Sequence, residues 1–161
     1  MNKRNKKEVV LILENVRSNF NVGSIFRTAD CSGVSKVYLC GYTPAPVDKF
    51  GRENKEMKKV SLGGDVSVSW EKVFSVSRLV KELRENGFEI VSLEQADDSV
   101  DYKKFKLKNK TAIIVGNEVK GVSKKTLENS DVKIEIPMMG EKESLNVSIA
   151  TAVALFRVLE I

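Results

Sequence analysis

The chain has 161 residues, 42% of them hydrophobic and 30% charged, which predicts a single globular domain over residues 1–161. No apolar run approaches the roughly 18 residues that a membrane-spanning helix needs. Residues 1–8 form a basic lead-in, and the apolar run behind them is too short for a signal sequence. We therefore expect a cytoplasmic protein without membrane partners.

The chain contains no histidine, and this restricts its chemistry. The absence excludes a histidine general base and every Ser-His-Asp or Cys-His mechanism, and it argues against a zinc-type metal site. Proton transfer must then use another side chain or water. The two cysteines, Cys31 and Cys40, form no CxxC pair, so we expect both to be reduced and buried or half-buried.

Lysine and arginine total 27 against 22 acidic residues, which gives a net charge of +5. The basic residues gather in three clusters, which are Lys3, Arg4, Lys6 and Lys7, then Lys49, Arg52, Lys55, Lys58 and Lys59, and finally Lys103, Lys104, Lys106, Lys108 and Lys110. Such clusters suit a polyanion that is bound through its phosphates. Composition alone favours the simpler interpretation of a lysine-rich surface, so both alternatives stay open at this point.

The spacing of apolar residues divides the chain into alternating strands and helices. Gly33 is placed to end the first helix, and Ser144 is the candidate cap of the last one. In chain order we expect a strand over 9–13, a helix over 22–31, a strand over 36–39, a long loop with one short helix over 42–65, a helix over 70–85, a strand over 88–93, a strand over 111–115, a short helix over 126–129, a strand over 132–136 and a helix over 145–159.

This alternation predicts an α/β fold with a mostly parallel sheet and helices on both faces. Ligands of such sheets bind beyond the carboxyl ends of the strands. Three polar segments that contain glycine are expected there, over residues 15–27, 116–121 and 137–146. The last helix is apolar nearly all round, which indicates packing on two sides, for example against the sheet and a second subunit.

Each of the three segments has a functional and a structural interpretation. Arg27 lies one helical turn after Gly23 and Ser24, where it could clamp a phosphate or simply extend from a surface helix. The turn at Gly116 could approach a flat ligand closely, or only connect two elements. Ser144 could border a site at a helix start, or only cap that helix.

Taken together and in this order, the three segments resemble the SpoU (TrmH-type) RNA 2′-O-ribose methyltransferases of the SPOUT superfamily. The resemblance rests on NVGSIFRTA at 21–29, VGNEVKG at 115–121 and IPMMGEKESLNVS at 136–148, which span most of the chain. It implies a SPOUT fold with a deep trefoil knot in its C-terminal part, and a homodimer. It also implies transfer of a methyl group from S-adenosylmethionine to a ribose 2′-hydroxyl, with S-adenosylhomocysteine as product and no metal.

The resemblance also assigns roles to residues. The implied catalytic residues are Asn21, Arg27, Glu118, Ser144 and Asn146. The implied cofactor-binding residues are Leu93, Gly116, Asn117, Ile136, Ser144 and Leu145. For RNA binding we expect Arg17, Arg52, Lys55, Lys59 and Lys120 to contribute, with further lysines from the cluster at 103–110.

The substrate and the activity leave alternatives. We favour tRNA over ribosomal RNA, because only a few lysines precede the first predicted strand and a compact target suits such a layout. A catalytically silent RNA-binding protein of the same fold is a further alternative, as is methylation of a base nitrogen. A Rossmann-like nucleotide enzyme is disfavoured, because the turn after the first strand contains one glycine instead of the GxGxxG pattern.

Overall fold

The computed structural model describes residues 7–161, and seven strands in this range form one sheet in the order β3-β2-β1-β6-β4-β7-β5. Every neighbouring pair in this order is parallel. The strands are β1 (Glu8–Glu14), β2 (Lys36–Cys40), β3 (Ser69–Val73), β4 (Glu89–Leu93), β5 (Val100–Asp101), β6 (Lys110–Val115) and β7 (Val132–Glu135). The helices are α1 (Asn19–Ser32), α2 (Lys55–Ser61), α3 (Gly64–Ser67), α4 (Val76–Glu85), α5 (Lys124–Glu128) and α6 (Val147–Leu159).

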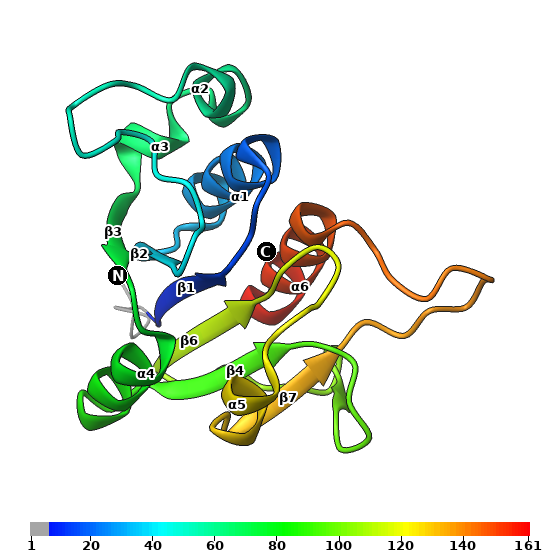
Figure 1. Cartoon of the computed structure of the whole chain (residues 1–161). Coiled ribbons are helices and arrows are strands. Elements are labelled where there is room, and N and C mark those ends of the chain that lie inside the picture. The colour runs from blue at the N-terminus through cyan, green and yellow to red at the C-terminus, as the bar shows by residue number, and fades with distance from the viewer. Residues whose placement is uncertain (1–6) are drawn as a thin grey trace, which may run out of the picture.

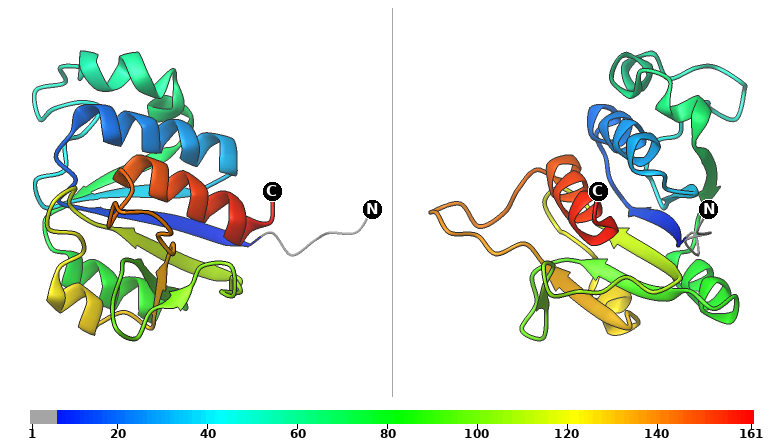
Figure 2. Two further views of the ribbon diagram at one scale, coloured as in Figure 1. Left: turned by 90° about the vertical axis from the view of Figure 1, so that its right-hand side faces the viewer. Right: turned by 180° about the vertical axis from the view of Figure 1, so that it is seen from behind.

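Helices cover both faces of the sheet, as expected for a parallel sheet (Figures 1 and 2). Helices α1 and α6 pack side by side on one face, with α2 and α3 packed against α1. Helices α4 and α5 lie on the other face. No helix in the range 7–161 is long and apolar enough to cross a membrane.

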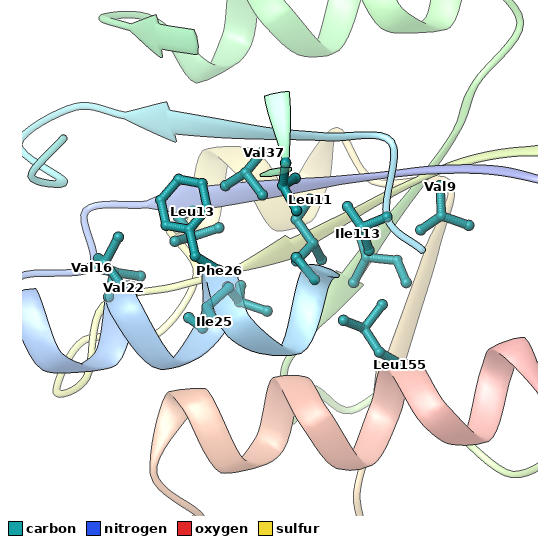
Figure 3. Close-up of a cluster of buried hydrophobic side chains, with 14 of the residues drawn as sticks. Val9, Leu11, Leu13, Val16, Val22, Ile25, Phe26, Val37, Ile113 and Leu155 are labelled. Carbon is teal, nitrogen blue, oxygen red and sulfur yellow. The ribbon is translucent and has the colours of Figure 1, made fainter. Parts of the chain in front are cut away.

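Strand β1 lies near the centre of the sheet and contributes to both hydrophobic clusters. Val9, Leu11 and Leu13 face α1 and α6, whereas Val10 and Ile12 face α4. Figure 3 shows the first cluster, in which apolar side chains of α1 and α6 close over the strand. Burying one Leu or Ile side chain stabilises a fold by ~1.5–3 kcal/mol, so these two clusters fix the helices against the sheet.

The expected fold class is confirmed, but residues 70–73, which were expected in a helix, belong to the edge strand β3. They pair with β2, with Cys40 opposite Val73. The helix begins only at Val76, where the side chain of Ser75 accepts a hydrogen bond from the backbone N–H of Arg78 at 3.3 Å. Strand pairing with a distant segment therefore outweighed the local helical spacing, and Phe74 lies exposed instead of on a helix face.

Three smaller expectations also need correction. The cap of α6 is Asn146, not Ser144, because the Asn146 side chain accepts from the backbone N–H groups of Ser148 and Ile149. Cys31 is exposed on α1, whereas Cys40 is buried. The long segment after β2 contains two short helices instead of one. The deep trefoil knot stays a prediction from the family resemblance.

Candidate active site

Three loops that follow parallel strands enclose a pocket at the carboxyl edge of the sheet. They comprise residues 94–95 after β4, 116–121 after β6 and 136–145 after β7. The pocket encloses about 730 Å³ of space, its open mouth included. In Figures 1 and 2 the third loop extends well away from the sheet before the chain returns into α6. Ligands bind at this edge of α/β proteins because the loops of neighbouring strands converge there.

All six residues that were expected to bind a cofactor line this pocket. They are Leu93, Gly116, Asn117, Ile136, Ser144 and Leu145. The remaining wall combines apolar side chains, such as Val115 and Met138, with the polar side chains of Glu94, Gln95 and Glu135. Apolar walls that carry a few polar groups suit a small organic ligand with both a flat ring and polar edges.

Gly116 lets two stretches of backbone pass in close contact. A Cβ atom at this position would lie 2.2 Å from the carbonyl carbon of Gly121 and 2.2 Å from the backbone nitrogen of Val122. Backbone atoms cannot turn aside as a flexible side chain does. The turn is closed by a reciprocal pair of backbone hydrogen bonds between Asn117 and Gly121, of 3.1 and 2.9 Å. Only glycine at 116 is compatible with this turn.

The carboxylate of Glu118 ties this turn to the start of α1. It accepts hydrogen bonds from the backbone N–H of Arg17 at 3.0 Å and of Ser18 at 2.9 Å, and from the side-chain amide of Asn21 at 3.0 Å. A carboxylate is favourable here because the first N–H groups of a helix have no partner inside it. The contact joins segments that lie about a hundred residues apart in the chain, because Arg17 and Glu118 are separated by 101 positions.

The side chain of Asn21 then links the first segment to the third. Its oxygen accepts a hydrogen bond from the side-chain amide of Asn146 at 3.1 Å. Asn146 in turn uses its own oxygen to cap α6, where it accepts from the backbone N–H of Ser148 at 2.9 Å. Glu118, Asn21 and Asn146 therefore form one hydrogen-bonded chain across all three motifs of the sequence.

The same contacts determine the ionisation of Glu118. Partial burial acts to raise the pKa of its carboxyl group, but the hydrogen bonds from Arg17, Ser18 and Asn21 outweigh burial and hold the pKa below its ordinary value. The group is therefore ionised at neutral pH and engaged by several donors. Such a carboxylate is suited to fixing the geometry of the loop and poorly suited to accepting a proton.

Asn117 fixes the other side of the turn. Its side-chain oxygen accepts from the backbone N–H groups of Val119 and Lys120 at 3.0 and 2.9 Å. Its amide donates to the carbonyl oxygen of Asn15 at 2.9 Å and to the hydroxyl oxygen of Tyr42 at 3.1 Å. All the polar atoms of this side chain are used by the protein, which makes Asn117 a supporting residue of the pocket wall.

Two carboxylates that the sequence did not single out hold the far end of the same loop. Glu94 accepts from the backbone N–H of Val122 at 2.9 Å, and the buried Glu14 accepts from the backbone N–H and the hydroxyl of Ser123 at 3.0 and 2.7 Å. The amide of Gln95 donates to the carbonyl oxygen of Glu143 at 2.7 Å and so ties the first loop to the third. Glu14 is the last residue of β1, and Glu94 and Gln95 directly follow β4. This position at the strand ends is the sequence signal that could have identified them.

Three of the expected catalytic residues, Asn21, Arg27 and Asn146, do not line the pocket. Asn21 and Asn146 are joined to it through Glu118, whereas Arg27 is not. Arg27 lies six residues after Asn21 on α1, which is ~9 Å along the helix axis and on a different face. Its side chain is exposed, and within residues 7–161 it has no ion pair or hydrogen bond. The guanidinium is therefore free to bind an anion from outside the protein.

The side chains expected to bind RNA are exposed at Arg17, Arg52, Lys55, Lys59 and Lys120. Arg17 lies beside Glu118 in a second hollow, and Lys55 and Lys59 are exposed on α2. Arg52 is 74% exposed although it pairs with Asp48. The cluster at 103–110 leads into the amino end of β6, at the opposite edge of the sheet. Lys3, Arg4 and Lys6 lie outside the described residues.

The parallel sheet, the pocket between its carboxyl loops and the three linked motifs agree with the α/β fold of the SpoU class. The family model described as "SpoU rRNA Methylase family" matches residues 8–156, and the chain belongs to this family. A tRNA (guanosine(18)-2′-O)-methyltransferase from Aquifex aeolicus is 33% identical over 153 residues, which cover 95% of this chain and 69% of that protein.

Solved structures agree with this assignment. An AdoMet-bound rRNA methyltransferase from Sinorhizobium meliloti superposes with a TM-score of 0.87 at 27% identity, over 96% of this chain and 57% of its own. A TrmH/SpoU tRNA modifying enzyme from A. aeolicus superposes with a TM-score of 0.83 at 32% identity, over 96% of this chain and 75% of its own. The chain spans 57 to 60% of the length of its staphylococcal relatives, which are 32% identical.

We expect Glu118→Gln to lower the free energy of unfolding at pH 7 by about 0.5–1.5 kcal/mol, because the amide offers one acceptor oxygen where the carboxylate offers two. The pKa of Glu118 is lowered in the folded chain, so its ionised form stabilises the fold above the ordinary pKa of 4.5. This contribution is lost as the pH falls through the lowered pKa.

Urea unfolding of the two proteins at pH 7 and at pH 3 measures the effect. The difference in the free energy of unfolding between the unaltered protein and Glu118→Gln should be smaller at pH 3 than at pH 7. Glu128→Gln is the matched control. Glu128 is exposed, and its single ion pair within residues 7–161, with Lys124, is long at 3.9 Å, so this substitution should leave the free energy of unfolding unchanged at both pH values. A difference that is the same at both pH values would contradict the assigned role of the carboxylate.

Proposed function

We propose that the protein transfers the methyl group of S-adenosylmethionine to a ribose 2′-hydroxyl of RNA, with tRNA as its substrate. The observation that carries the proposal is the hydrogen-bonded chain Glu118–Asn21–Asn146, which links the three family motifs around one pocket. The tRNA substrate is supported by the name of the Aquifex relative, which is a tRNA 2′-O-methyltransferase. Methylation of ribosomal RNA is the alternative that the Sinorhizobium structure supports.

The pocket fits a nucleoside cofactor. Leu93, Ile136 and Leu145 supply apolar wall for a flat base, and the turn at Gly116 brings bare backbone groups to the ligand. When it is bound, the sulfonium of the cofactor supplies an electrophilic methyl carbon, which the ribose oxygen attacks while the carbon–sulfur bond breaks. The residues of this chain then need only to bind, align and take part in proton transfer.

Arg27 is proposed to bind the phosphate next to the target ribose and to orient the 2′-hydroxyl. Its free, exposed guanidinium matches a phosphate in shape and charge. Because a guanidinium stays protonated at neutral pH, and because Glu118 is engaged by three donors, neither is assigned as the base. The hydroxyl proton leaves to a phosphate oxygen or to water.

The protein is further proposed to act as a homodimer through α6. One face of this helix and its lead-in presents Leu145, Ile149, Val153 and Phe156, which are 37 to 52% exposed although they are large and apolar. They recur at intervals of three and four residues, so they form one continuous stripe. Phe20, on the neighbouring helix α1, is also 54% exposed. A stripe of this kind is typical of a subunit interface.

Transfer of labelled methyl from S-adenosylmethionine to bulk tRNA and to ribosomal RNA, followed by nucleoside analysis, tests the reaction. We expect a 2′-O-methylnucleoside in the tRNA pool. Arg27→Ala should reduce transfer at least 100-fold while cofactor affinity stays within twofold, because the lost group acts on RNA. Arg78→Ala, which removes an exposed arginine of α4, is the matched control and should transfer like the unaltered protein. Full activity of Arg27→Ala would overturn the assigned role.

A glycine substitution tests the pocket. Gly116→Ala should weaken cofactor binding at least tenfold, because its Cβ meets backbone atoms at 2.2 Å and forces the turn to open. Gly140→Ala is the matched control in the neighbouring loop, where a Cβ would meet no atom within 4 Å. Isothermal titration with S-adenosylhomocysteine measures both. Equal affinity of the two variants would place the cofactor elsewhere.

A charge on the stripe tests the dimer. The unaltered protein is expected to have twice its chain mass of 18.0 kDa in light scattering after size exclusion. Ile149→Glu should shift it to the monomer, because the interface would bury an unpaired charge. Val66→Glu is the control, since Val66 is 78% exposed on α3 outside the stripe, and should leave the mass unchanged. A monomeric unaltered protein would exclude this interface.

A further inference from the structure

Two exposed residues border the turn at Asn117 and Glu118 on the side of β1 and β2. They are Arg17, which follows β1, and Tyr42, which follows β2. The hydroxyl oxygen of Tyr42 accepts a hydrogen bond from the amide of Asn117 at 3.1 Å, and the backbone N–H of Arg17 donates to Glu118 at 3.0 Å. Asn117 and Glu118 both line the pocket, so Arg17 and Tyr42 adjoin the candidate active site.

The segment that carries Tyr42 is held on both sides of this residue. The backbone N–H of Tyr42 donates to the side-chain oxygen of Asn15 at 3.2 Å. The ammonium of Lys72 donates to the carbonyl oxygens of Gly41, at 2.6 Å, and of Thr43. The ring is nevertheless 56% exposed. A ring that is fixed and exposed can bind a flat partner with little loss of side-chain freedom.

Arg17 carries a guanidinium that is free to bind an external group. Its side chain is exposed and, within residues 7–161, has no ion pair or hydrogen bond. Arg17 lines the second hollow, which shares Glu118 and Val119 with the pocket and therefore adjoins it. Asn15, which bonds to the backbone of Tyr42, lies two residues before Arg17, a distance of at most ~7 Å along the chain. Arg17 and Tyr42 thus belong to one small area of the surface.

The loop on the other side of the pocket is acidic. This loop follows β4 and comprises residues 94–101, which contain no lysine or arginine and four acidic residues, Glu94, Asp97, Asp98 and Asp101. Glu94 itself lines the pocket. Within residues 7–161, Asp98 alone of the four has an ion pair shorter than 3 Å. Such a loop repels a polyanion, whereas the free guanidinium of Arg17 attracts it, so RNA is favoured on the side of β1 and β2.

We propose that the RNA strand next to the target nucleotide passes over the carboxyl ends of β1 and β2, where Arg17 binds one of its phosphates and Tyr42 stacks on one of its bases. This inference rests on the proposed function and adds the direction in which the RNA leaves the pocket. A guanidinium matches a phosphate in shape and charge. Stacking on a side chain requires an accessible base face, so the neighbouring nucleotide is unpaired.

The role of Tyr42 is tested by RNA binding in the absence of cofactor. Fluorescence anisotropy is recorded with a labelled single-stranded 12-nucleotide RNA without secondary structure. Tyr42→Leu should weaken binding about 5-fold to 100-fold, the range that loss of base stacking produces. Tyr42→Phe is the matched control, because it keeps the ring and loses only the hydrogen bond to Asn117, and it should bind within twofold of the unaltered protein. Both variants should bind S-adenosylhomocysteine like the unaltered protein in isothermal titration.

The role of Arg17 is tested by the salt dependence of binding to the same RNA. Each phosphate contact to a single strand contributes about 0.7 to the slope of log affinity against log salt concentration. Arg17→Gln should therefore reduce the steepness of this slope by about 0.7. Arg78→Gln, which neutralises an exposed arginine of α4 on the other face of the sheet, is the matched control and should leave the slope unchanged.

Three results would overturn the proposal. The first is a Tyr42→Leu variant that binds the RNA as tightly as the unaltered protein. The second is an equal loss of RNA binding in Tyr42→Phe, or a loss of S-adenosylhomocysteine binding in either variant, because Tyr42 would then only support Asn117 and the pocket. The third is an unchanged salt slope in Arg17→Gln. If the expected RNA effects are found but no methyl transfer to any RNA occurs, the proposed function fails while this RNA-binding surface stands.

Discussion

The contact between Glu118 and the amino end of α1 is the constraint on which the candidate site depends. The carboxylate accepts backbone hydrogen bonds from a loop that follows β1, although it belongs to a loop that follows β6. The two strands are neighbours in the sheet, so their loops leave side by side and each lacks internal partners for its polar groups. One ionised side chain supplies those partners and fixes where α1 begins relative to the pocket.

The remaining support of the pocket follows the same pattern. Glu94 and Glu14 accept hydrogen bonds from the backbone at Val122 and Ser123, at the far end of the loop that begins at Gly116. This loop is thus held by carboxylates from two other strand ends, and its own Glu118 ties it to the start of α1. The close approach at Gly116 is compatible only with a loop that is fixed in this way, because its backbone atoms leave no space for adjustment.

Much of this site could be predicted from the sequence, because local motifs carried the information. The six expected cofactor residues line one pocket, and Asn21, Glu118 and Asn146 are joined by hydrogen bonds. The parts that could not be predicted depend on contacts between distant segments. Residues 69–73 form a strand only because β2 offers an edge, and the roles of Glu94 and Gln95 depend on which loops the fold brings next to them. Serine is a residue type that often caps helices, so Ser144 was a reasonable candidate. Asn146 lies closer to the first turn of α6 and caps the helix instead.

The order of strands has a consequence for how the molecule is made. Strand β6 lies between β1 and β4, and Glu8 is paired with Lys110, so the central strand of the sheet is synthesised long after its neighbour. Pairings between such distant segments form slowly, because a long loop must close before any contact compensates the lost entropy. The growing chain therefore carries the strongly apolar β1 without its central partner until most of the protein has left the ribosome. A nascent or truncated chain that lacks β6 cannot assemble the pocket. Until β6 pairs, the edge of β1 is unpaired and prone to aggregation, and molecular chaperones are suited to cover such an edge.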